Sequence, residues 1–172
     1  MKKITLSALA LLLTIVSFSQ TDQGRILVGV GSNTSFSSTS IDGNDDNDNT
    51  FSIGLNGGYF IIDNLVAGAS LSFLRNTQGD FSSNAFGIGP FVRGYYEMFF
   101  AEAGVSFFDN NAESDFGEFD SSGNQINFGL GYAAFINDYI SVEPSLNYSI
   151  GGGDFDGINT FSLNVGFAIY LP

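Results

Sequence analysis

Cysteine, histidine and tryptophan are all absent from this chain of 172 residues. Without cysteine the chain can form neither disulfides nor thiolate metal sites, and it has no thiol nucleophile. Without histidine it lacks the commonest general base and the commonest transition-metal ligand, which excludes Ser-His and Asp-His hydrolase mechanisms. We therefore expect neither an enzyme nor a bound cofactor.

Basic residues are scarce as well. Lys and Arg number 5 against 18 Asp and Glu, which gives a formal net charge of -13. A strongly anionic surface repels the phosphate backbone of nucleic acids. Nucleic acid is therefore excluded as a partner.

Long apolar runs are also missing, except at the N-terminus. Lys2 and Lys3 precede an apolar stretch over residues 4–16, and Ser17-Phe18-Ser19 places small residues where a signal peptidase reads. The stretch is shorter than the roughly 20 residues that a membrane-spanning helix needs, which disfavours the alternative of an anchoring helix. We predict a cleaved signal peptide over residues 1–19 and a mature domain over residues 20–172.

The mature part instead alternates between apolar and polar residues with a period of two. The alternating segments are roughly ten residues long, the length that a tilted transmembrane strand requires. The connections between them alternate as well: those at 37–49, 76–83, 109–124 and 151–159 are long and polar, whereas those near Asp63, Glu97 and Asp138 are short. This pattern predicts an all-β fold, an eight-stranded antiparallel up-and-down transmembrane β-barrel, with strands over residues 25–36, 50–61, 65–73, 86–96, 99–107, 126–134, 140–150 and 160–171.

Alternation alone leaves open whether the apolar face points inward, as in a soluble lipocalin-like ligand-binding barrel, or outward into lipid. About 40 bulky apolar side chains are too many for the interior of an eight-stranded barrel. The opposite face consists of Gly, Ser, Asn, Thr and Ala with almost no charge, which is unlike a soluble surface. We therefore place the apolar face in lipid, with an interfacial girdle of aromatic residues near the short turns: Tyr59, Tyr95, Tyr96, Phe99, Phe100, Tyr139 and Tyr170.

Several segments carry a resemblance to a known family. They are the N-terminal signal, "GYFIIDNLVAGASLSF" at 58–73, "FGIGPFVRGYYE" at 86–97 and the alternating C-terminal strand. Together they resemble the small outer-membrane β-barrel family of OmpA- and OmpX-type barrels, often labelled porin-like. The resemblance implies a bacterial outer-membrane location, outer-membrane lipid and the barrel-assembly machinery as partners, and a monomer.

Three charged residues within the predicted strands share the lumen face: Arg93, Glu102 and Glu143. A short turn at Glu97-Met98 places Arg93 opposite Glu102, and Glu143 lies at a similar height. The cluster is interpreted as a structural plug of the lumen, with a proton or ion relay as the alternative.

Twelve of the 18 carboxylates fall in the predicted long connections: Asp42, Asp45, Asp46, Asp48, Asp80, Asp109, Glu113, Asp115, Glu118, Asp120, Asp154 and Asp156. In the run "IDGNDDNDN" at 41–49, Asp42, Asn44, Asp46 and Asp48 alternate as weak cation ligands could. The calcium-loop pattern fails, because Asn47 replaces the required glycine and Ile53 the bidentate glutamate. A solvated acidic loop, or diffuse cation bridging to lipid headgroups, is favoured, and no metal site is assigned.

Two functions from different classes remain open. The first is a structural or surface-interaction barrel with a narrow, packed lumen and acidic extracellular loops. The second is a narrow porin-like channel for ions or small solutes.

Overall fold

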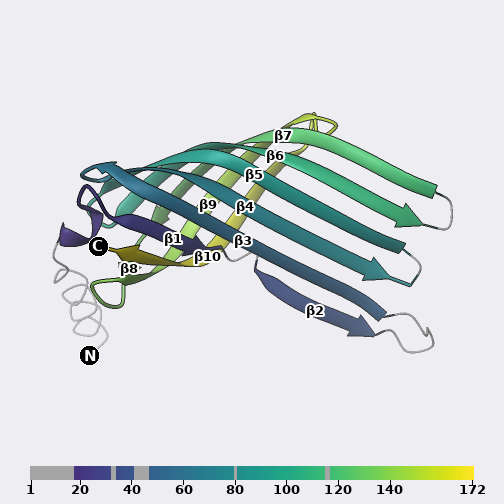
Figure 1. Cartoon of the computed structure of the whole chain (residues 1–172), viewed down its shortest axis with the longest axis horizontal. Coiled ribbons are helices and arrows are strands. Elements are labelled where there is room, and N and C mark those ends of the chain that lie inside the picture. The colour runs from purple at the N-terminus through teal and green to yellow at the C-terminus, as the bar shows by residue number, and fades with distance from the viewer. Residues whose placement is uncertain (1–17, 32–33, 41–46, 80, 115–116) are drawn as a thin grey trace, which may run out of the picture.

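The computed structural model describes residues 18–31, 34–40, 47–79, 81–114 and 117–172 (Figure 1). The predicted signal peptide lies almost wholly outside these ranges, so its cleavage before Gln20 stays a prediction. Phe18–Thr21 form a single 3-10 turn, η1, at the base of the molecule. No helix in the described part of the chain is long and apolar enough to cross a membrane.

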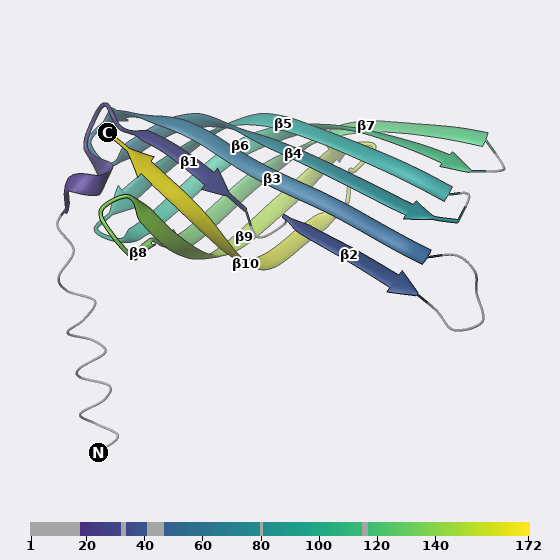
Figure 2. The ribbon, with the colours of Figure 1, turned by 60° about the horizontal axis from the view of Figure 1, so that its bottom comes forward.

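The described residues form one antiparallel sheet that closes on itself, because β1 pairs with both β10 and β3. The tight turns and the C-terminus lie at one end of the barrel (Figures 1 and 2). The strands are β1 (Ile26–Val30), β2 (Ser35–Ser40), β3 (Asn47–Ile62), β4 (Leu65–Gln78), β5 (Phe81–Tyr96), β6 (Phe99–Ser114), β7 (Gly117–Tyr132), β8 (Ala134–Phe135), β9 (Ile140–Gly153) and β10 (Asn159–Leu171).

These ten segments make eight strands of a barrel. β1 and β2 both pair with β3, but Ser35 lies opposite Ser52 where the register of β1 would place Thr50, so the first strand is broken by a two-residue shift. β8 pairs with β9 in the register already set by β7, so it continues that strand past Ala133. The predicted eight-stranded antiparallel barrel is confirmed.

The short connections also lie where the sequence predicts them. Ile62 pairs with Leu65, and Tyr96 pairs with Phe99, which makes both turns two residues long. Asn64 and Glu97 adopt φ values of 64° and 56° in these turns. Asn tolerates this left-handed region better than most residues, because its short polar side chain can hydrogen-bond locally.

Two of the connections predicted as long polar loops, 76–83 and 109–124, are mostly strand, so the loops expected there are wrong. The connection predicted at 151–159 is present over residues 154–158. β4 runs to Gln78 and β5 begins at Phe81, while β6 runs to Ser114 and β7 begins at Gly117. A strand ladder is held by backbone hydrogen bonds, so it continues where the side chains become polar and the apolar alternation fades. β3 to β7 therefore extend well beyond β9 and β10 as a curved projecting sheet (Figures 1 and 2).

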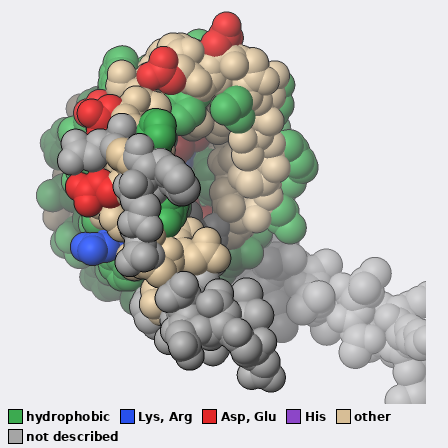
Figure 3. Space-filling view, turned by 90° about the vertical axis from the view of Figure 1, so that its right-hand side faces the viewer, with side chains coloured by type: hydrophobic (Ala, Val, Ile, Leu, Met, Phe, Trp, Pro, Cys, Tyr) green, Lys and Arg blue, Asp and Glu red, His purple; other side chains and the backbone are tan. Residues whose placement is uncertain are grey.

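The wall of the barrel presents its bulky apolar side chains outward. On β10, Phe161, Leu163, Val165 and Phe167 are exposed, whereas Ala168 and Tyr170 are buried. Hydrophobic side chains cover the outer flanks of the ring when it is viewed from the hairpin tips (Figure 3). An exposed apolar belt around a closed sheet is the arrangement that a bilayer accepts, because closure of the sheet lets neighbouring strands satisfy the backbone hydrogen bonds.

Candidate functional site

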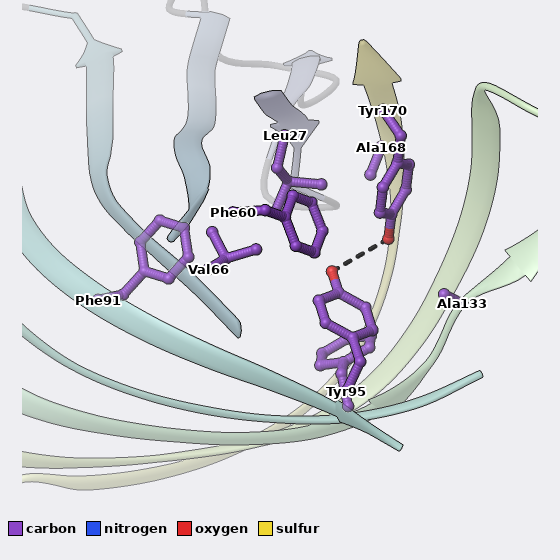
Figure 4. Close-up of a cluster of buried hydrophobic side chains, with 9 residues drawn as sticks. Leu27, Phe60, Val66, Phe91, Tyr95, Ala133, Ala168 and Tyr170 are labelled. Atoms are coloured by element: carbon purple, nitrogen blue, oxygen red, sulfur yellow. Dashed lines mark hydrogen bonds between the residues drawn. The ribbon is translucent and has the colours of Figure 1, made fainter. Parts of the chain in front are cut away.

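The buried apolar core lies inside the barrel, close to the tight turns (Figure 4). The expectation that the whole lumen face is small and polar is wrong at this end. Near the tight turns both faces of the strands are apolar, as in Phe60-Ile61 and Phe99-Phe100, so one of each pair must point inward. The core consists of Leu27, Phe60, Val66, Phe91, Tyr95, Phe100, Ala133, Ala168 and Tyr170.

This core also corrects the predicted aromatic girdle. Tyr95, Phe100 and Tyr170 are buried in the lumen. The Tyr95 ring contacts those of Phe60, Phe100 and Tyr170, and the Tyr170 ring also contacts Phe60, at centroid distances of 5.8 to 6.3 Å. The other four members of the predicted girdle are exposed: Tyr59, Tyr96, Phe99 and Tyr139. A reduced girdle remains on the outer wall, and the inward aromatic residues close the base of the lumen.

The structure brings together the three charged residues predicted to share the lumen. Arg93 lies opposite Glu102 in the β5–β6 ladder, and its Nε donates to Glu102 Oε2 over 2.7 Å. Arg93 Nη1 donates to Glu143 Oε2 over 2.8 Å. Arg93 and Glu143 are each 6% exposed. One guanidinium therefore bridges carboxylates from β6 and β9.

Sequence reasoning missed the neutral partners of this cluster. Tyr170 donates its hydroxyl to Glu143 Oε1 over 2.7 Å, and Ser141 Oγ donates to the same oxygen over 2.9 Å. Tyr95 accepts a bond from Arg93 Nη1 at 3.3 Å, and its hydroxyl lies 3.0 Å from that of Tyr170. The alternation of side chains along a strand could have predicted two of these partners. Tyr95 lies two residues from Arg93, and Ser141 lies two residues from Glu143, so each shares the face of its charged neighbour.

The network and the aromatic core together fill one end of the lumen. The Arg93 guanidinium lies 4.3 Å from the centroid of the Phe100 ring, so the charge cluster rests on the core. Its members come from β5, β6, β9 and β10, on opposite sides of the ring. We call this assembly the base plug.

η1 adds a further layer under the β3–β4 turn. Thr21 Oγ1 donates to Asn64 Oδ1 over 2.6 Å, and the backbone N–H of Asn64 donates to the Thr21 backbone carbonyl over 2.8 Å. Gln20 and Thr21 are both buried. The N-terminal segment is thus fixed against the turn that it underlies.

Above the base plug the lumen widens into a cavity of about 510 Å³. Its walls carry hydroxyl and amide side chains, and Figure 3 shows the molecule hollowed at the hairpin-tip end. Two of these side chains are linked to each other, since Ser149 Oγ donates to Asn127 Oδ1 over 2.8 Å. We call this cavity above the base plug the cup.

Most of the candidate cation-binding loop cannot be placed. Asp42, Asn44 and Asp46 lie outside the described residues, and Asp48 belongs to β3, where its backbone pairs with Gln78. Within the described ranges, no group of three or more His, Cys, Asp or Glu side chains is placed to hold a metal ion.

The other predicted loop carboxylates divide between strands and a turn. Asp109 and Glu113 lie in β6 and Glu118 and Asp120 in β7, so they belong to the projecting sheet and not to a loop. Asp154 and Asp156 lie in the β9–β10 connection as predicted, and Asp154 Oδ2 accepts a bond from the Ser122 amide over 2.8 Å. Asp45, Asp80 and Asp115 lie outside the described residues.

Comparison with known proteins identifies the fold. No model of a known protein family matches the chain, and no curated protein matches its sequence. The N-terminal β-barrel domain of Pseudomonas aeruginosa OprF superposes with a TM-score of 0.54 at 12% identity, over 87% of this chain and 98% of that one. Ail, the attachment invasion locus protein of Yersinia pestis, gives 0.54 at 12% identity over 87% and 99%, and its structure in a phospholipid nanodisc gives 0.51 at 16% over 87% and 100%. The chain therefore has the fold of the small bacterial outer-membrane β-barrels, as its resemblance to that family predicts.

Proposed function

We propose that the chain is an integral outer-membrane barrel that does not conduct and that serves a structural or surface-interaction role. The observation that carries the proposal is the base plug. Arg93, Glu102 and Glu143 join strands across the lumen, and the aromatic core fills the space beneath them. An ion crossing the barrel would have to displace a buried ion pair and tightly packed rings.

The outer wall supports the membrane location. Exposed apolar side chains occur on every long strand of the barrel, and the ladders of the wall close on themselves. In a bilayer these side chains meet acyl chains, and the short turns lie on the periplasmic side as in other barrels of this class.

The projecting sheet supports the surface-interaction role. β3 to β7 extend past the shorter strands β9 and β10, so two hairpins stand clear of the wall (Figure 2). Asp109, Glu113 and Asp120 are exposed on the β6–β7 hairpin. Such a surface favours a partner with a basic contact region.

A narrow porin-like channel is the second candidate, and the cavity of about 510 Å³ favours it over a solid lumen. Conductance across a planar lipid bilayer separates the two functions. We expect the wild type to give no steady single-channel current. A Phe60→Ala/Tyr95→Ala variant, which removes two rings of the base plug, should give currents because it opens the base. Steady currents from the folded wild type would overturn the proposed non-conducting role and support the channel function.

A further inference from the structure

One row of lumen-facing residues crosses the floor of the cup just above the base plug. The ladders place Arg93 opposite Glu102, Glu102 opposite Gly129, Gly129 opposite Asn147 and Asn147 opposite Ser162. Gly129 has no side chain, so a gap separates the Glu102 and Asn147 side chains. A Cβ atom at Gly129 would lie 2.7 Å from Asn147 Oδ1 and 3.6 Å from Glu102 Cβ, which shows how narrow this gap is.

Both side chains beside the gap carry hydrogen-bond acceptors. Glu102 uses Oε2 for Arg93, and among the described residues its Oε1 has no hydrogen-bond or ion-pair partner. The Glu102 side chain is 23% exposed, and it lines the cavity. Asn147 donates its Nδ2 to Ser145 Oγ over 3.0 Å, which fixes the amide so that Oδ1 lies over Gly129.

The charge of the floor is unbalanced. Glu102 and Glu143 carry two negative charges, and Arg93 is the only basic residue that lines the cavity in the described part of the chain. A net negative charge inside a narrow barrel is unfavourable unless a cation or water compensates it. The gap beside Glu102 is the place where the floor is both negative and open to the cavity.

The acceptors also define which cation fits. A divalent metal ion would require six or more oxygen ligands or an octahedral set, and the floor supplies one free carboxylate oxygen and one amide oxygen. A primary ammonium group carries three N–H donors, which is enough for one Glu102 oxygen, the Asn147 oxygen and a water or hydroxyl. The cavity of about 510 Å³ falls within the range of small-molecule sites, so it has room for the rest of the molecule.

We propose that the cup binds a small organic ammonium compound from the extracellular side, with its NH₃⁺ group between Glu102 Oε1 and Asn147 Oδ1 over Gly129. The rest of the molecule would face the hydroxyl and amide side chains of the wall and its phenyl rings, among them Phe91 and Phe108. This inference goes beyond the proposed surface role, because a solute bound in a closed cup requires no partner on the projecting sheet.

Calorimetric titration of the folded protein in lipid-free, nonionic detergent micelles tests the site. The probe is ethanolammonium chloride, and choline chloride is its control, since choline has the same charge but no N–H donor on nitrogen. For one charge-assisted site we expect saturable ethanolammonium binding with Kd on the order of 1 mM or tighter, and at least about tenfold weaker choline binding. No saturable binding, or equal binding of the two cations, would overturn the proposal.

Variants separate the site from general attraction to an acidic protein. Glu102→Gln removes the carboxylate, and Gly129→Ala fills the gap with every charge retained; each should weaken ethanolammonium binding at least about tenfold. Asp109→Asn on the exposed face of β6 makes the same charge change as Glu102→Gln outside the cup, and it should leave the affinity unchanged. A heat-dependent mobility shift in detergent gels verifies that each variant is folded.

Two results would contradict the site. Equal weakening by Glu102→Gln and Asp109→Asn would mean that only net charge attracts the cation. Wild-type affinity in the folded Gly129→Ala variant would mean that the gap is not where the ammonium group binds. Both results are independent of the conductance measurement, so the proposed function and the cation site can fail separately.

Discussion

At the residue scale, Arg93 has the largest electrostatic role in the barrel. It is the sole cation in contact with Glu102 and Glu143 among the described residues, and its side chain is 7% exposed. Removing one partner of a buried ion pair leaves the other charge uncompensated, which is more harmful than replacing the whole group by apolar residues. The stability of the base therefore depends on the cluster as a unit.

The first prediction concerns this unit. Arg93→Ala should lower the free energy of unfolding by about 3 to 5 kcal/mol, because two carboxylates remain in the lumen without their cation. Urea unfolding in liposomes, followed by circular dichroism, measures the change. Arg75→Ala, an exposed arginine on β4, is the control and should leave the stability near that of the wild type.

A combined variant sharpens the test. Arg93→Met together with Glu102→Gln and Glu143→Gln removes all three charges at once, and it should recover part of the stability lost in Arg93→Ala. Wild-type stability of Arg93→Ala alone would show that the cluster does not hold the base together.

At the element scale, the close approach of β5 and β6 depends on glycine. At Gly89 a Cβ atom would collide with the backbone carbonyl of Val105, and the β5–β6 register has no Cα partners at Gly89 and Pro90. Gly57 on β3 differs, since a Cβ atom there would meet nothing within 4 Å.

These two glycines give a matched pair of variants. Gly89→Ala should destabilise the barrel by about 1 to 3 kcal/mol, because the strands must separate to admit the methyl group. Gly57→Ala should be neutral or slightly stabilising. Thermal midpoints from heat-dependent gel mobility compare the two, and similar midpoints would mean that the strands part without strain.

The elements also show how far sequence reasoning reaches. The strand number and the Arg93–Glu102 pairing were predictable, because period-two alternation and two-residue turns fix the register. The lengths of β4 to β7 were not, since backbone pairing continues through polar segments that carry no apolar signal. The inward-pointing aromatic residues were not predicted. Tyr95-Tyr96 and Phe99-Phe100 place an aromatic residue on both faces of the strand, so residue type alone does not say which ring points to lipid.

At the scale of the whole molecule, the base plug and the tips of the projecting sheet lie at opposite ends. The buried core and the charge cluster lie near the tight turns, whereas the β6–β7 hairpin ends far from them (Figure 1). We predict that replacing residues 110–121 by Asn-Gly, which joins the opposed residues Asp109 and Ser122 in a two-residue turn, leaves a folded barrel.

The truncated chain should keep its heat-dependent mobility shift and its resistance to urea, because no member of the base plug is removed. Binding of the intact chain to a basic surface should weaken, since Glu113 and Asp120 are lost. A truncated chain that fails to fold would show that the projecting sheet is part of the folding unit.

The two strands that close the ring, β1 and β10, also contribute side chains to its buried interior. Leu27 on β1 lies opposite Tyr170 on β10, both side chains are fully buried, and the Tyr170 hydroxyl completes the bonds to Glu143. The strand that closes the ring therefore supplies a hydrogen-bond donor to a carboxylate on the neighbouring strand β9. Closure of the ring and completion of the hydrogen bonds to Glu143 therefore depend on the same strand, so a ring closed on β9 without β10 would leave Glu143 without its phenol donor. This hydrogen bond thus favours the complete barrel over one that lacks β10.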